Sequence, residues 1–247
     1  MISRLFFLLM LTVFTPLSNA DSVTHFKSST TQTQLLELYT SQGCSSCPPA
    51  EKWLNQYLTK PYLWQQVIPI NFHVDYWDSL GWPDPYASSV FTQRQRIYKA
   101  LGNTHVVATP GFVINGQGWN GWFYGKPLPI LRPKEVGTLG LIIDNANVNA
   151  SFTPSSLNNK KLILNIARIG FDLKNAIHRG ENAGKVLKHD FVALSFQKIP
   201  FQQSNISYVL SGTLDKAIAK SEMQGVVAWV TRENNPTPIQ SVGGFLN

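Results

Sequence analysis

The hydrophobic pattern of the first 146 residues alternates between short apolar runs and segments with helical spacing. Short apolar runs are typical of buried strands, whereas apolar residues three and four positions apart indicate one face of a helix. The Asn115-Gly116 pair that follows the third run is typical of a hairpin turn. In chain order, the predicted elements are a strand at 35–39, a helix with its apolar face over 50–58, a strand at 67–74, a helix at 88–101, a strand at 111–114 and a helix at 133–143.

The order of these elements predicts an α/β domain over residues 21–146. Two strands joined by a helix imply a parallel pair, and a hairpin adds an antiparallel strand. We therefore expect a central mixed sheet flanked by helices.

After residue 146 the pattern changes to short strands separated by glycine and proline, with little helix. Such a succession is typical of a small β-sandwich. We therefore predict a β-rich C-terminal subdomain at 147–247. Its strand-like runs are 162–169, 191–196, 206–210 and 226–231.

The first 20 residues have the features of a secretory signal peptide. Arg4 gives a positive start, an apolar run follows at 5–14, and small residues permit cleavage after Ala20. The run is shorter than the roughly 20 apolar residues of a transmembrane helix, so we predict no stable membrane span, with an uncleaved anchor as the alternative. Cleavage implies a periplasmic or secreted protein.

Composition changes this picture little. The formal net charge is +7, but the basic residues form no dense run, so nucleic acid is not a predicted partner. Charged residues make up 14% and hydrophobic residues 43% of the chain, which argues against disorder and for a buried core.

Cys44 and Cys47 are the only cysteines, and they lie between the first predicted strand and the first predicted helix. Two cysteines build neither a multi-disulfide scaffold nor a four-thiolate zinc site. A thiol attacks a disulfide as the thiolate, which a helix N-terminus stabilises. The C-x-x-C spacing therefore predicts a redox pair, with Cys44 as the exposed attacking thiol and Cys47 as the resolving thiol.

Further residues are candidates for the same site. Glu37, in the strand before the cysteines, would be buried and accept a proton from Cys47, or else face solvent. Thr109-Pro110 precedes a strand, and a cis proline there would present backbone to an incoming peptide. Two further candidates are Trp77 and Trp82, which would either bind substrate or pack the loop in which they lie against the rest of the domain.

Three other features have a structural interpretation. His73 ends the second strand near Asp75, and we expect an ordinary hydrogen-bonded pair there rather than a proton carrier or metal ligand. Arg94 and Arg96 are expected on a solvated helix face. The glycine-containing stretch 179–184 is expected to be a turn.

A family resemblance is carried by the stretches 37–50, 73–82, 91–98 and 179–184. They resemble an exported bacterial family of unknown function, domain-of-unknown-function family 1223. The order of strand, C-x-x-C helix, Thr-Pro and hairpin also resembles the thioredoxin superfamily. Together the resemblances imply a thioredoxin-like domain followed by a C-terminal β-subdomain. The chain departs from thioredoxin in the Ser45-Ser46 pair between its cysteines, which leaves redox potential and partner open.

These features predict an exported thiol–disulfide oxidoreductase without a cofactor, whose partners are protein or small-molecule thiols and disulfides. One alternative is copper or zinc binding by Cys44, Cys47 and His73, because thiolates and imidazole suit both metals. The other is a non-enzymatic binding module in which the two cysteines form a structural disulfide. The direction of electron transfer and the oligomeric state stay open.

Overall fold

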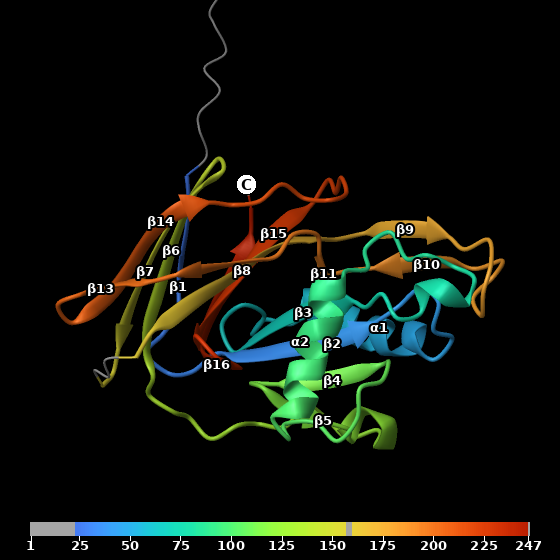
Figure 1. Ribbon diagram of the computed structural model, residues 1–247, viewed down its shortest axis with the longest axis horizontal. Coiled ribbons are helices and arrows are strands. Elements are labelled where there is room, and N and C mark those ends of the chain that lie inside the picture. Colours follow the sequence, from blue (N-terminus) through green and yellow to red (C-terminus); the bar gives the residue numbers. More distant parts are fainter. Residues whose placement is uncertain (1–22, 157–159, 247) are drawn as a thin grey trace, which may run out of the picture.

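The computed structural model describes residues 23–156 and 160–246, and most of this part of the chain is β-structure. Strands account for 44% and helices for 14%. Figure 1 shows the two α-helices beside a long sheet, with a second sheet at one end of the molecule. The helices are α1 (Cys47–Asn55) and α2 (Ser89–Ala100), and the 3-10 helices are η1 (Gln56–Thr59), η2 (Asp78–Leu80) and η3 (Gly121–Tyr124).

The larger sheet has nine strands and contains both N-terminal and C-terminal segments. Its strands follow the order β16-β15-β8-β11-β3-β2-β4-β5, and β12 pairs with β8. They are β2 (Gln34–Thr40), β3 (Val67–His73), β4 (Gly111–Ile114), β5 (Gln117–Trp119), β8 (Leu162–Gly170), β11 (Val192–Ala193), β12 (Gln197–Pro200), β15 (Gln224–Arg232) and β16 (Asn235–Phe245).

The smaller sheet has five strands in the order β1-β6-β7-β14-β13, and all its pairs are antiparallel. A separate two-stranded hairpin joins β9 to β10. These strands are β1 (Thr24–Lys27), β6 (Gly137–Asp144), β7 (Asn147–Pro154), β9 (Leu173–Ala176), β10 (Val186–His189), β13 (Gln202–Ser204) and β14 (Ser207–Thr213).

The predicted fold class, an α/β thioredoxin-like domain with flanking helices followed by a separate β-sandwich, is wrong. The described residues are mostly β, and the two α-helices are short. The C-terminal strands extend the same sheet, because β11 pairs in parallel with β3 and antiparallel with β8. The predicted boundary between residues 146 and 147 falls at the turn from β6 to β7, and strands from both sides share both large sheets.

The helix predicted over 133–143 is wrong as well, since Gly137–Asp144 forms β6. Leu139 and Ile143 are four apart, which fits a helix turn, but the buried Leu141 between them reveals the alternation of a strand. Gly137 has a φ of 112°, and a Cβ there would collide with the Thr153 carbonyl of the neighbouring strand. Only glycine fits this close approach of two backbones.

The elements around the cysteines match their predictions. β2 and β3 pair in parallel and β4 adds an antiparallel strand, with α1 and α2 in the predicted places. The predicted runs at 162–169 and 226–231 are confirmed as β8 and β15.

β15 links the two hydrophobic cores of the molecule. Val227 and Trp229 belong to the core that includes β2, β3 and both helices. Val226, Ala228 and Val230, on the other face, belong to the core beneath the smaller sheet. Burying each large apolar side chain contributes roughly 1.5–3 kcal/mol, so the two cores stabilise one shared strand.

Among the described residues, no helix has the length and apolar character needed to cross a membrane. The predicted signal peptide, with its cleavage point after Ala20, lies outside the described residues.

Candidate functional site

Cys44 and Cys47 form a disulfide at the N-terminus of α1, with their Cα atoms 5.5 Å apart. Pro48 and Pro49 follow in the first turn of the helix, where a missing N–H costs no intrahelical hydrogen bond. Both sulfur-bearing residues are buried, Cys44 being 1% exposed. The prediction that Cys44 is exposed is therefore wrong for this oxidised state.

One of the predicted substrate-binding residues, Thr109, lies against this disulfide, and Trp77 contacts Thr109 in turn. The Thr109-Pro110 bond is cis, and the Thr109 carbonyl oxygen is 3.7 Å from Cys44 Sγ. Trp77 Nε1 donates a hydrogen bond to Thr109 Oγ1 at 2.8 Å. Trp77 also packs against Gly43, because a Cβ atom added to Gly43 would lie 3.2 Å from the Cβ of Trp77. The loop after β3 therefore contacts both Gly43 and Thr109, the neighbours of Cys44.

Trp82 reaches the cysteine loop through a different neighbour. Its Nε1 donates to Gln42 Oε1 at 2.9 Å, and Gln42 lies two residues before Cys44. Substrate binding by Trp77, Trp82, Thr109 and Pro110 stays a prediction.

The stretch 179–184, expected to be only a turn, also contacts the cysteine loop. Asn182 Nδ2 donates to the backbone oxygens of Gln42 and Cys44, each at 2.9 Å, and Asn182 is fully buried. Glu181 Oε2 accepts a hydrogen bond from the Ser45 N–H at 2.8 Å. Hydrogen bonds from Ser45 hold the pKa of Glu181 below its ordinary value.

Glu37 is buried, but its carboxylate faces away from the cysteines. It accepts hydrogen bonds from Arg94 Nε at 2.8 Å and Nη2 at 2.9 Å, and from the hydroxyls of Tyr39 and Tyr98 at 2.8 and 2.7 Å. Arg94 is 4% exposed, so its expected place on a solvated helix face is wrong. None of these described contacts joins Glu37 to Cys47, and its proton-accepting role stays a prediction.

A different carboxylate, Glu51, lies on α1 one turn after Cys47 and on the same helix face. It accepts from Thr40 Oγ1 at 2.6 Å and from Asn71 Nδ2 at 3.2 Å. Its Oε2 is 2.5 Å from His189 Nδ1, at the end of β10. Burial alone would raise the pKa of Glu51, but His189 and the other partners hold it below its ordinary value.

His73, the last residue of β3, lies beside this pair. Its Nδ1 is 2.7 Å from Asp84 Oδ2, and Asp84 also accepts from the Gln42 and Tyr86 N–H groups at 2.8 and 3.0 Å. Burial lowers the pKa of His73, but Asp84 outweighs it and the net shift is upward. The partner expected from the sequence, Asp75, instead accepts from Thr92 at 2.5 Å.

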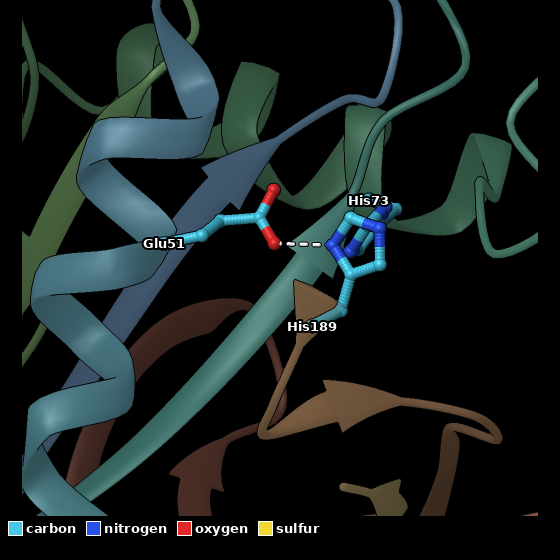
Figure 2. A group of neighbouring side chains, drawn as sticks. All are labelled: Glu51, His73 and His189. Carbon is cyan, nitrogen blue, oxygen red and sulfur yellow. Dashed lines mark hydrogen bonds and ion pairs between the residues drawn. The ribbon is translucent and has the colours of Figure 1, made fainter. Parts of the chain in front are cut away.

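Figure 2 shows Glu51 reaching from α1 toward His189, with the His73 ring close behind. One ligand atom from each residue lies within 4.8 Å of the other two. The two imidazole rings are 5.1 Å apart between centroids and nearly perpendicular. His73 Nε2 is buried and has no hydrogen-bond partner, whereas His189 Nε2 lies 3.1 Å from Gln42 Nε2, so the cluster has one unused ligand nitrogen in its interior.

Comparison with known proteins places the chain in a family. The family described as "Protein of unknown function (DUF1223)" matches residues 35–231. The chain belongs to the DUF1223 family. No curated protein matches it.

Two solved structures resemble the fold of this DUF1223 protein. The crystal structure of a structural-genomics target from Agrobacterium tumefaciens has a TM-score of 0.54 and 21% identity, over 89% of this chain and 94% of that one. HBP35 of Porphyromonas gingivalis has a TM-score of 0.59 and 15% identity, over 89% and 76%. At these identities the likeness concerns the fold alone.

Sequence reasoning about the DUF1223 protein missed Glu51, His189 and Asp84. Glu51 carried a usable signal, because four residues after Cys47 is the same face of the predicted helix. His189 carried none, since 138 positions separate it from Glu51.

Proposed function

We propose that this DUF1223 protein is an exported thiol–disulfide oxidoreductase that uses Cys44 and Cys47. The observation that carries the proposal is the disulfide at the N-terminus of α1, with its Cys44 sulfur beside the Thr109 carbonyl. The sequence pattern of residues 1–20 supports export to a compartment where such disulfides persist. Its partners are protein or small-molecule thiols and disulfides.

In the reduced protein, the Cys44 thiolate attacks one sulfur of a substrate disulfide. A Cys44–substrate bond forms, and the other substrate sulfur leaves as a thiolate that takes up a proton. The Cys47 thiolate then attacks Cys44 Sγ, forming the Cys44–Cys47 disulfide and releasing the second substrate thiol. The substrate gains two electrons and the cysteine pair loses them, and the same steps in reverse oxidise a dithiol.

The local structure supports the roles of the two cysteines in these reaction steps. Unpaired N–H groups at a helix N-terminus favour a thiolate, and Cys47 begins α1. Ser45 and Ser46, between the cysteines, are exposed, so the loop reaches the surface even though the sulfurs do not. Substrate access requires Trp77 or the 179–184 stretch to move away from Cys44.

Mixed-disulfide trapping tests the proposal. The Cys47→Ser variant of the full chain, incubated with a model disulfide such as oxidised glutathione, should accumulate an adduct on Cys44 seen by mass spectrometry. The Cys44→Ser variant is the matched control and should accumulate markedly less. Equal labelling of both variants, or of neither, would overturn the assignment of Cys44 as the attacking thiol.

The burial of Cys44 favours a second candidate, a binding module with a structural disulfide. The reduction potential of the wild-type pair separates the two. A potential near those of thioredoxin-like catalysts, about −120 to −270 mV, supports exchange, and one below about −300 mV supports the structural role.

A further inference from the structure

We propose that Glu51, His73 and His189 form a binding site for a divalent transition-metal ion of the Zn²⁺ type. This inference does not depend on thiol chemistry, because none of the three ligands is a cysteine. It also differs from the alternative metal site of the sequence analysis, which combined His73 with Cys44 and Cys47, since both sulfurs are engaged in the disulfide.

The placement of the histidines is the first observation. The chain has five histidines, and of these His25, His105 and His178 are exposed. The other two, His73 and His189, are 0% and 1% exposed and meet at the ends of β3 and β10. Two strands far apart in sequence thus deliver both buried imidazoles to one carboxylate on α1.

The state of His73 is the second observation. Asp84 holds Nδ1, and Asp84 is itself fixed by backbone N–H groups of Gln42 and Tyr86. Nε2, on the other side of the ring, is fully buried without a partner. A carboxylate that orients one imidazole nitrogen while the other binds a metal is the usual outer-shell arrangement of histidine ligands.

The donor chemistry selects the class of ion. Two imidazoles and one carboxylate are a known ligand set of zinc, whereas Mg²⁺ and Ca²⁺ prefer oxygen ligands alone. Charge balance agrees with this choice. A divalent ion would neutralise Glu51 and Asp84 with both imidazoles in the neutral form that ligation requires. The Glu51–His189 hydrogen bond would open as the ion takes Nδ1. The neutral His189 would then carry its proton on Nε2, beside the Gln42 side-chain amide 3.1 Å away.

Binding should be measured on the oxidised full chain after chelator treatment, because the disulfide removes both thiolates as ligands. We expect one equivalent of Zn²⁺ to bind in competition with a chromophoric chelator. Co²⁺ should give ligand-field bands without thiolate charge-transfer absorption. Mg²⁺ should not compete. An oxidised protein that binds neither Zn²⁺ nor Co²⁺ stoichiometrically would overturn the site and identify the cluster as an internal ion-pair network.

Variants locate the ion. His73→Gln and His189→Gln should each lower Zn²⁺ affinity more than the roughly 10–100-fold expected for Asp84→Asn, which removes only the carboxylate behind His73. His178→Gln is the matched control, because this ring is exposed beside Trp82 and should leave affinity unchanged. Circular dichroism checks that each variant folds.

The wild-type Co²⁺ spectrum keeps the test decisive if a ligand variant does not fold. Zn²⁺ binding that appears only after reduction and disappears in Cys47→Ser would assign the ion to the thiolates and contradict the proposed ligands. That outcome would leave the proposed exchange chemistry to be judged by adduct formation on Cys44, so the two ideas fail separately.

Discussion

Glu37 and Glu51 are buried carboxylates on opposite faces of the larger sheet. Thr40 of β2 contacts Glu51, and a residue three positions earlier on a strand points to the other face, where Glu37 meets α2. Figure 1 shows α2 crossing in front of β2 and β3. The two acids have similar burial and differ in their partners.

The partners decide what each acid can do. Arg94 is always charged, so its two hydrogen bonds to Glu37 form a permanent ion pair, and Tyr39 and Tyr98 complete the carboxylate's contacts. Burial raises the pKa of both tyrosines, which keeps them as neutral donors. Glu51 instead pairs with an imidazole, which accepts a proton or a metal as well as donating. One face of the sheet therefore carries an ion pair whose charges are fixed, and the other carries a carboxylate–imidazole pair whose protonation can change.

Arg94→Met removes the partner of Glu37 on α2 and should cause the largest loss in the free energy of unfolding. Removing one partner of a buried pair leaves the Glu37 charge uncompensated, which typically costs ~3–5 kcal/mol. Urea unfolding at neutral pH measures the loss. Arg96→Met on the same helix is exposed and should change the free energy of unfolding by less than ~0.5 kcal/mol. Equal losses in both variants would contradict a special role for the Glu37–Arg94 pair.

Zn²⁺ should stabilise the protein only through the cluster of Glu51, His73 and His189. At about 100 times its dissociation constant, an ion that binds only the folded state raises the free energy of unfolding by about 2.7 kcal/mol. We expect this increment in the oxidised wild type and in Arg96→Met, and its removal by chelator. His189→Gln should show no increment. A zinc-dependent increment that survives in His189→Gln would place the ion outside the cluster.

The fold near the cysteines was predictable because it is local. β2, α1, β3, α2 and β4 each carry their own periodicity, and the strand–helix–strand order implies the parallel pair. The joining of β11 to β3 depends on contacts across 121 positions, such as Asn71 with Val192, which no local pattern encodes. The sequence of β6 also fits a helix, because the four-residue spacing of Leu139 and Ile143 satisfies both periods.

The site was predictable in part. The disulfide pair and its neighbours Thr109 and Trp77 follow from motif and spacing. Glu37 is the acid that the sequence places in the strand before the cysteines, but the structure puts Glu51 of α1, and not Glu37, on the helix face of Cys47. The sequence does not show that Arg94 faces inward. Nor does it show that Glu181 and Asn182 fold back over the cysteine loop and His189 over α1, since each of these contacts spans more than 130 residues.

Asn182→Ala tests whether the stretch 179–184 limits access of reagents to the Cys44–Cys47 disulfide. Losing its two hydrogen bonds removes the side-chain donor from the Gln42 carbonyl and leaves the Cys44 carbonyl with only the Cys47 N–H, which should cost ~1–3 kcal/mol of stability. The Cys44–Cys47 disulfide should then be reduced faster by dithiothreitol in a stopped-flow assay. Asn147→Ala, exposed on β7, is the control and should leave the rate unchanged. An unchanged rate in Asn182→Ala would show that this stretch does not limit access to the sulfurs.

Protonation of Glu181 should give the smallest effect, a pH-dependent change that is confined to the cysteine loop around Ser45. Its pKa lies below the ordinary value because Ser45 donates to the carboxylate, so the contact is complete above that ordinary value and is lost as the pH falls through the lowered pKa. The Ser45 amide resonance should therefore shift in NMR spectra with a midpoint below 4.5, the ordinary value for glutamate. Glu181→Gln should abolish this titration, whereas the exposed Glu222→Gln should not. A Ser45 resonance that titrates identically in Glu181→Gln would mean that another acid senses the cysteine loop, and the stretch 179–184 would lose its electrostatic link to the disulfide.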